Sequence, residues 1–122
     1  MSTHNEIKKV SARIVRLVEA LISTNDMVRG SYSIVHLRCG KATCRCAKPG
    51  QKGHVCTRIT WTANGTSRTK TLREEDRERL RKAVETYRMF RRGRRQLRTQ
   101  EKLLEELLDK HEQAFANNPD KI

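Results

Sequence analysis

The stretch RCGKATCRCAKPGQKGH at residues 38–54 most restricts how this chain can fold, because it places three of the four cysteines beside a histidine. A structural zinc ion takes four thiolate or imidazole ligands in a tetrahedron, on a backbone that turns tightly around it. The glycines of the stretch permit such turns and let the histidine fold back toward the cysteines. The sequence therefore predicts a Zn²⁺ site. Its ligands would be Cys39, Cys44, Cys46 and His54.

Two features of this stretch leave alternatives open. Cys56 is an alternative fourth ligand, because positions 54 and 56 share a face if a strand starts there. The spacing also differs from a pair of C-x-x-C knuckles, so disulfides and reduced structural cysteines remain alternatives to a metal. A bridge between Cys44 and Cys46 would be strained, and in a reducing compartment clustered cysteines are more often metal ligands.

The residues around the predicted metal are unsuited to catalysis. No Asp or Glu occurs between residues 27 and 73, so no general base accompanies a metal-bound water there. No C-x-x-C unit is present for redox chemistry, although Lys41, Arg45 and Lys48 would lower thiol pKa values. We expect neither an enzyme nor a small-molecule substrate.

The composition explains why a metal would be needed. Of the 122 residues 35% are hydrophobic and 4% aromatic, whereas 34% are charged, so little apolar surface is available for a core. A structural metal and the association of amphipathic helices both stabilise such chains. The length indicates a single domain over residues 1–122.

Periodicity and turn signals predict an α+β fold. An N-terminal helix over 5–24, capped by Thr3 or Asn5, places five apolar residues on one seam: Ile7, Val10, Ile14, Leu17 and Leu21. Residues 31–72 should contain the zinc loop within a small three-stranded antiparallel sheet, with strands at 31–38, 55–63 and 66–72. Asn64-Gly65 signals the hairpin between the last two.

A long basic helix is predicted over residues 73–115, followed by a frayed tail over 116–122. Its three-four spacing resembles a coiled-coil seam, which needs the N-terminal helix or a second protomer as a partner. Arg94 and Glu101 would form a register-setting ion pair in that seam. The seam positions are Ala83, Tyr87, Phe90, Arg94, Leu97, Glu101, Leu104, Leu108, His111 and Phe115. We expect the seam aromatics to belong to the core. Trp61, beside the hairpin turn, would either cap the small core, which is the favoured role, or offer a stacking surface.

The net charge of +13 predicts a polyanionic partner. A membrane surface is disfavoured, because most basic residues are Arg and the positive stretches lack Trp or Phe anchors. No uninterrupted apolar run approaches membrane-spanning length. The stretch MSTHNEIKKV also lacks the pattern of a secretory signal. We therefore expect a cytoplasmic protein associated with nucleic acid.

The basic residues concentrate on one stretch of the long helix. Between Arg77 and Arg98 there are ten Lys or Arg and two acids, Glu78 and Glu85. Five arginines, here called the arginine stripe, fall within about a third of the circumference, beside the apolar seam. They are Arg88, Arg91, Arg92, Arg95 and Arg98. Cations that could extend the stripe are Arg68, Lys70, Lys41, Arg45, Lys48 and Lys52.

Arginine forks bind phosphate oxygens bidentately, so the arginine stripe is expected to follow a nucleic-acid backbone, DNA rather than RNA. The alternative for this face is a solvated surface paired with acids of a neighbouring helix.

The motif RCGKATCRCA, with VRGS before it and a Gly-His turn, a hairpin and ETYRMFR after it, resembles a family of small bacterial and archaeal proteins of unknown function. That family's pattern is similar to GS, RCGK-x-x-CRCA, GHGP and a helix like ENYRRFR. The resemblance covers roughly residues 28–108 and places the family's motif residues on Cys39, Cys44, Cys46 and His54. This chain departs from the pattern at 55–58, where it reads VCTR. The resemblance also implies a similarity to accessory factors of mobile elements.

Together these observations predict a zinc-stabilised, nucleic-acid-binding accessory or regulatory protein, either a homodimer or joined to a protein partner through its helices. The alternative is an interaction adaptor whose long helix docks onto a larger enzyme, such as a mobile-element or nucleic-acid-processing complex.

Overall fold

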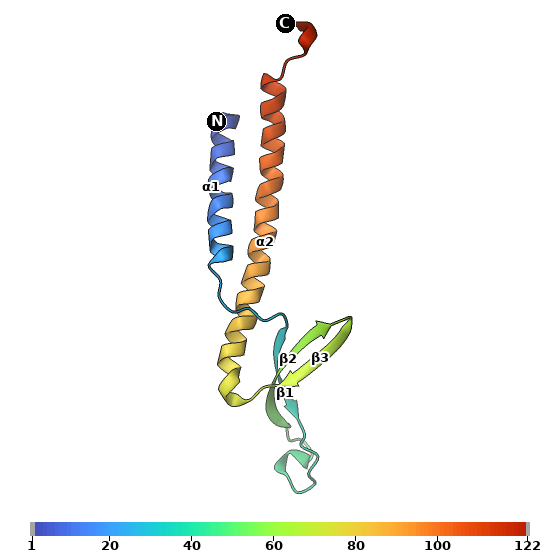
Figure 1. Ribbon diagram of the computed structural model, residues 1–122. Coiled ribbons are helices and arrows are strands. Elements are labelled where there is room, and N and C mark those ends of the chain that lie inside the picture. The colour runs from blue at the N-terminus through green and yellow to red at the C-terminus, as the bar shows by residue number, and fades with distance from the viewer. Residues whose placement is uncertain (1, 122) are drawn as a thin grey trace. The chain divides into compact units, whose positions relative to one another are not determined.

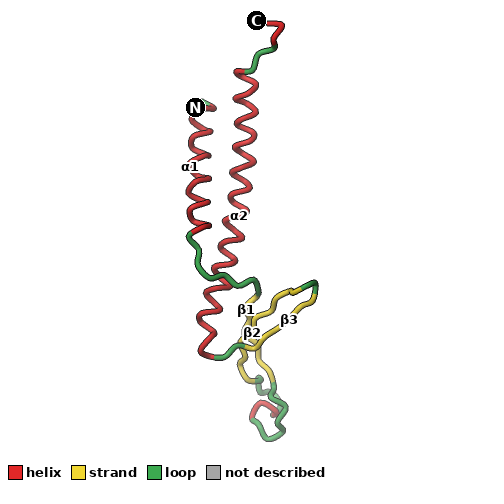
Figure 2. The backbone as a smooth tube through the Cα atoms, in the orientation of Figure 1, coloured by secondary structure: helices red, strands yellow, loops and turns green. Residues whose placement is uncertain are grey.

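The computed structural model describes residues 2–121 (Figure 1). Its order is α1 (Thr3–Ile22), β1 (Ser31–Leu37), β2 (His54–Ala63), β3 (Thr66–Thr71) and α2 (Glu74–Phe115), as Figure 2 shows. Short 3₁₀ helices lie at Arg45–Ala47 and Pro119–Lys121. The predicted α+β class, with an N-terminal helix, a three-stranded antiparallel sheet and a long C-terminal helix, is confirmed.

The chain divides into two compact units. The helical hairpin comprises Met1–Asn25 and Arg88–Ile122, and the sheet unit comprises Asp26–Tyr87. The helix α2 contributes its first turns to the sheet unit and the remainder to the helical hairpin. The single domain predicted over residues 1–122 stays a prediction.

The ends of α1 differ from the predicted ones by two residues. Ser2 is the N-cap, since its side chain accepts a hydrogen bond from the Asn5 backbone N–H at 3.2 Å. A hydroxyl at that position satisfies a backbone donor that the helix itself cannot. Thr3, a predicted cap, is the first helical residue instead. The helix ends where the Ser23 backbone N–H donates to the Glu19 carbonyl at 3.2 Å.

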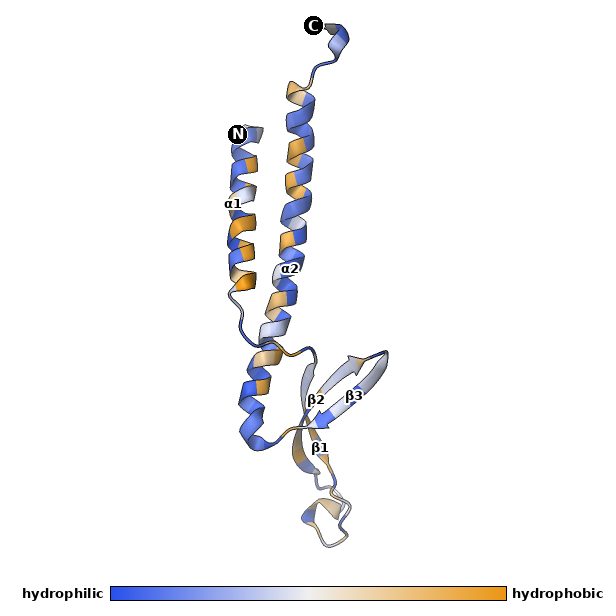
Figure 3. Cartoon of the chain, in the orientation of Figure 1, coloured by the Kyte–Doolittle hydropathy of each residue, from blue (hydrophilic) through white to orange (hydrophobic). Residues whose placement is uncertain are grey.

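In the helical hairpin, α1 packs antiparallel against the C-terminal part of α2. Val10 and Leu107 are buried and line the same hollow, and Arg13 donates a hydrogen bond to Gln100 Oε1 at 3.4 Å. Further along, a Cβ on Gly93 would lie 2.8 Å from Leu21 Cδ2, so the missing side chain lets the two helices approach. Apolar residues recur along both helices (Figure 3).

The buried and half-buried face of α2 is formed partly by other residues than the predicted seam. Phe90, Leu97 and Leu104 are half-buried as expected, but their companions are Gly93, Gln100 and the buried Leu107. The predicted companions Arg94, Glu101 and Leu108 are exposed. So are His111 and Phe115 at the end of the predicted seam, and Phe115, at 71% exposed, is not a core aromatic as predicted.

The predicted ion pair between Arg94 and Glu101 is wrong, because no pair between them is present in residues 2–121. The helix α2 faces α1 with Gly93 instead of Arg94, and so the charged groups of Arg94 and Glu101 keep their water.

The sheet of the second unit has the order β1-β2-β3, with both neighbouring pairs antiparallel. The hairpin turn between β2 and β3 is Asn64-Gly65, with φ of 51° and 78°. Two consecutive residues at positive φ form the turn that matches the twist of paired strands. The hairpin predicted from Asn-Gly is therefore confirmed.

A small core joins the sheet to the first turns of α2. Ile59, Leu72 and Val84 are buried, and the half-buried Val28, Tyr32, Trp61 and Leu80 pack against them. The Val28 backbone N–H donates to the Ala83 carbonyl at 3.1 Å, which fixes the segment before β1 to α2. Trp61 therefore contributes to the core, as the sequence predicts.

The segment after α2 contains the 3₁₀ helix Pro119–Lys121, where the sequence predicts a frayed tail; residue 122 of that tail lies outside the described residues.

Candidate metal centre

The cysteine loop is held by the ends of two paired strands. Leu37, the last residue of β1, pairs with His54, the first residue of β2. Between them the chain leaves the sheet and returns to the same place. The position of His54 is therefore set by the sheet, because the ladder fixes the start of β2 next to the end of β1.

At the end of this loop Gly53 lies very close to the backbone of Leu37 and Arg38. A Cβ at this position would lie 2.3 Å from the Leu37 carbonyl carbon, 2.5 Å from its oxygen and 2.7 Å from the Arg38 nitrogen. Only a residue without a side chain fits such a contact. The sequence assigned Gly53 a role in turning the chain, whereas the structure shows that it is required for space.

Within the loop, short turns bring the cysteines toward one another. Gly40 and Gly50 adopt φ of +81° and +80°, which other residues rarely adopt. The Cys44 backbone N–H donates to the Lys41 carbonyl at 3.1 Å, and the 3₁₀ helix Arg45–Ala47 then places Cys46 inward, where it is 4% exposed. The other cluster members are less buried: Cys44 is half-buried, and Cys39 and His54 are exposed.

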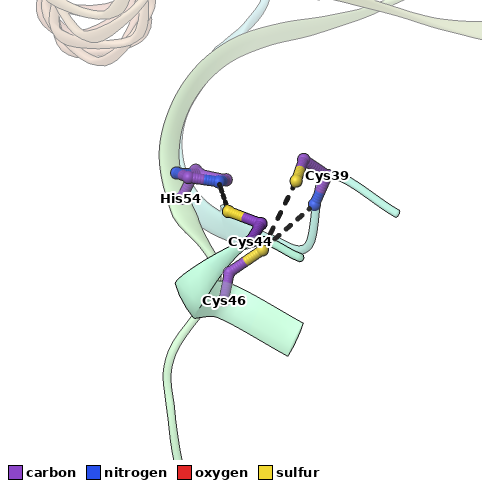
Figure 4. A group of neighbouring side chains, drawn as sticks. All are labelled: Cys39, Cys44, Cys46 and His54. Atoms are coloured by element: carbon purple, nitrogen blue, oxygen red, sulfur yellow. Dashed lines mark hydrogen bonds between the residues drawn. The ribbon is translucent and has the colours of Figure 1, made fainter. Parts of the chain in front are cut away.

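The four predicted ligand atoms lie together (Figure 4), all within 4.8 Å of one another. The Sγ atoms of Cys39 and Cys46 are 3.6 Å apart, and Cys44 Sγ lies 3.2 Å from His54 Nε2. In a tetrahedron with Zn–S bonds of about 2.3 Å and Zn–N bonds of about 2.0–2.1 Å, neighbouring ligand atoms are about 3.5–3.8 Å apart. The cluster therefore needs only small adjustments to hold a metal ion.

The thiols of the cluster are not joined by disulfides. All four cysteines are free, and 3.6 Å between Cys39 and Cys46 is far longer than the disulfide bond of about 2.05 Å. The disulfide alternative that the sequence left open does not describe this arrangement.

The surroundings favour a thiolate at Cys39. The pKa of this thiol is lowered to about 6, by a hydrogen bond from the Lys41 backbone N–H and by further bonds with the His54, Cys44 and Cys46 side chains. A hydrogen bond from the Cys39 backbone N–H lowers the pKa of Cys46, but burial and the neighbouring sulfurs outweigh it, so that this pKa is raised. A thiolate at Cys39 suits a metal site, because the thiolate is the form of cysteine that binds metals.

Cys56 lies outside the cluster. It is half-buried two residues along β2 from His54, opposite Val35 of β1. A strand rises about 3.3 Å per residue, so Cys56 lies further from the loop although it shares the face of His54. Of the two candidates for the fourth ligand, the structure brings His54 to the three cysteines.

The cations predicted around the loop are all exposed: Lys41, Arg45, Lys48 and Lys52. Arg68 and Lys70 are exposed on β3. Residues 27–73 hold ten Lys or Arg and no acid, and within this stretch only Arg73 has an ion pair, with Glu75 at 3.5 Å. The loop and sheet therefore carry a large positive charge, which three thiolates and a divalent ion would lower by one.

The arginine stripe, Arg88, Arg91, Arg92, Arg95 and Arg98, lies within the helical hairpin, and all five side chains are exposed. Within residues 2–121 none of them pairs with a carboxylate; the ion pairs that involve α2 are Arg73 with Glu75, Arg79 with Asp76, and Arg81 with Glu78. At about 100° per residue, the stripe is centred nearly opposite the half-buried face of α2 that includes Gly93 and Leu107. The sequence placed it beside the seam, and the change follows from the corrected seam.

No helix in the described part of the chain is long and apolar enough to cross a membrane.

Comparison with known proteins places the chain in a family. The family described as a domain of unknown function (DUF6788) matches residues 5–82, and the chain belongs to it. The expected family of unknown function is thus confirmed, over residues 5–82 instead of the expected 28–108, so that the ETYRMFR segment lies outside the matched part. No curated protein and no solved structure matches the chain.

Proposed function

We propose that this member of the DUF6788 family is a zinc-stabilised accessory or regulatory protein that binds nucleic acid, DNA rather than RNA, without catalysing a reaction. The observation that carries the proposal is the exposed arginine stripe, which is free of carboxylate partners in the described residues. The metal would fix the loop and the sheet, and the stripe would hold phosphates.

The choice of zinc is supported by the ligand types. Three thiolates and one imidazole suit Zn²⁺, and soft sulfur ligands disfavour Mg²⁺ and Ca²⁺. The chain supplies all four ligands, so no open coordination position remains for a substrate. The absence of acids from residues 27–73 leaves no general base close in sequence. A structural role for the ion follows.

Phosphate binding is supported by the length of the arginine stripe and by its lack of carboxylate partners in the described residues. Arg88 to Arg98 spans about 15 Å along α2 at 1.5 Å per residue, enough to follow a nucleic-acid backbone across several phosphates. A guanidinium group that is not paired with a carboxylate loses no ion pair when it binds a phosphate oxygen, so less of the binding free energy is offset. In the sheet unit, the exposed cations of the loop and of β3 would add contacts.

The test is a fluorescence-anisotropy titration of labelled DNA and RNA duplexes over a salt series. If all five stripe arginines neutralise a phosphate, log K should fall with log salt with a slope of about −4.5, which weakens DNA binding about 500-fold between 50 and 200 mM salt. Replacing Arg91 and Arg95 together by alanine should reduce the slope to about −2.7 and the loss to about 40-fold.

The matched control replaces Arg79 and Arg81 by alanine. This variant loses the same charge from the same helix, but these arginines already pair with Asp76 at 3.3 Å and Glu78 at 2.6 Å. Its salt slope should stay close to that of the unaltered protein. Equal slopes for both double variants, or no salt-dependent binding at all, would refute phosphate contact through the stripe.

The alternative function, an adaptor or homodimer that associates through its helices, is favoured by one observation. Val15, Val18 and Ile22 of α1 are 55%, 38% and 77% exposed and recur at three-four spacing. Sedimentation of the protein over a range of concentrations tests it: a dimer that Val18→Glu dissociates would support association through this face. A monomer at all concentrations would exclude the homodimer.

A further inference from the structure

The hairpin of β2 and β3 presents one aromatic side chain among cations. In the register of these strands Trp61 is directly opposite Arg68, and Ile59 is directly opposite Lys70. Residues that face each other across an antiparallel pair share a face of the sheet, with Cβ atoms about 4.5–5.5 Å apart. Trp61, Arg68 and Lys70 therefore lie on the same face, the one that carries the core residue Ile59.

A hollow of about 260 Å³ lies beside this tryptophan, entirely within the sheet unit. Its apolar lining includes the buried Ile59 and Leu72 and the half-buried Leu80, and Arg29 and Lys70 also line it. Trp61 packs against the core and also lines the hollow, so part of its ring system is not covered by protein. The volume is slightly below that of pockets for drug-sized ligands, about 300–1,000 Å³, and suits a single planar ring system.

The charges around the hollow indicate what such a ligand carries. Arg29 and Arg68 are exposed, as is Lys70, and within residues 2–121 none of the three has an ion-pair partner. No acid occurs anywhere in residues 27–73. The acids of the sheet unit lie outside that stretch, at Asp26 and in the first turns of α2. An aromatic wall beside exposed cations is complementary to a flat ring linked to phosphates.

We propose that this hollow takes one unpaired base of a single-stranded nucleic acid, stacked on Trp61, with Arg29, Arg68 and Lys70 neutralising the adjacent phosphates. The proposal rests on the proposed function and extends it by naming single strands as a ligand class. Bases in a duplex are stacked on their neighbours, so a duplex would meet only the cations. The arginine stripe would bind both kinds of polymer through phosphate alone.

The chain reports on this site directly, because Trp61 is its only tryptophan. The full-length, metal-loaded protein is titrated with an unstructured single-stranded oligonucleotide, with a duplex of equal length and with polyphosphate, a polyanion without bases. We expect saturable quenching of the tryptophan fluorescence by the single strand alone. Equal quenching by polyphosphate, or no quenching by a single strand that anisotropy shows to be bound, would overturn the proposal.

A variant separates this site from the arginine stripe. Trp61→Leu keeps an apolar side chain against the core but removes the stacking surface, and should weaken single-strand binding roughly 5- to 100-fold while leaving duplex binding unchanged. Trp61→Phe, which keeps a ring, should restore part of the affinity. Equal losses for both polymers in the leucine variant, with its circular dichroism unchanged, would refute base stacking.

The two proposals fail differently. If neither polymer binds in a salt-dependent way, the proposed function fails and the base site with it. If both polymers bind in a salt-dependent way but the tryptophan signal does not respond, only the base site is refuted.

Discussion

Replacement of Gly53 by alanine should disrupt the metal site although it removes no ligand. The new Cβ would lie 2.3 Å from the Leu37 carbonyl carbon, about 1.1 Å short of the 3.4 Å at which ordinary contact begins. The atoms that it meets belong to the backbone, so no rotamer change relieves the overlap. Overpacking typically costs about 1–3 kcal/mol, and a clash with rigid backbone belongs at the upper end.

If the whole cost of about 3 kcal/mol falls on the loop conformation that binds the metal, the metal affinity is weakened about 100-fold. The backbone can relieve the overlap only by moving Gly53 away from Leu37, which displaces His54 from the thiols. The assay is competition for Zn²⁺ with a chromophoric chelator, together with the visible spectrum of the Co²⁺ form. In the variant that spectrum should lose the intensity typical of tetrahedral thiolate coordination.

Gly50 provides the matched control in the same loop. Nothing lies within 4 Å of a Cβ at this position, but its φ of +80° disfavours alanine by about 1–2 kcal/mol. Gly50→Ala should therefore weaken metal binding less than Gly53→Ala, and Gly50→Asn less again, since asparagine tolerates positive φ. If Gly53→Ala bound metal as tightly as the unaltered protein, the close approach at the base of the loop would not position His54.

Two further predictions concern the metal ligands and the helical hairpin. Cys44→Ser should lose bound zinc in elemental analysis and lower the thermal stability of the sheet unit, whereas Cys56→Ser should retain the metal; loss from both variants would mean that the ligand set is different. Leu107→Ala should destabilise the protein by about 2–5 kcal/mol in urea unfolding, because that side chain is 4% exposed, whereas Leu108→Ala, at a position 41% exposed, should cost under about 1 kcal/mol. If Leu108→Ala destabilised the protein more than Leu107→Ala, the seam predicted from the sequence would be right.

Features that depend on neighbouring residues could be predicted from the sequence. The spacing of Ile7, Val10 and Ile14 specifies a helix, and Asn64-Gly65 specifies a hairpin, because helical period and turn geometry are local properties of the backbone. The same holds for the ligand types in the loop, whose glycines permit tight turns at the required places.

Other features depend on elements that meet only in the folded chain. The contact of α1 with α2 determined that Gly93 and Leu107, not Arg94 and Leu108, turn inward, because small and apolar side chains pack where charged ones would have to lose water.

At the metal centre the amino-acid sequence determined which side chains were available, whereas the pairing of β1 with β2 determined which of them meet. His54 stands next to the cysteines because it pairs with Leu37 at the mouth of the loop, and Cys56 is carried away along the strand. The close approach at Gly53 and the hollow beside Trp61 also arise between segments distant in sequence. Distances of this kind are set by packing and strand register, for which no local pattern in the sequence provides a signal.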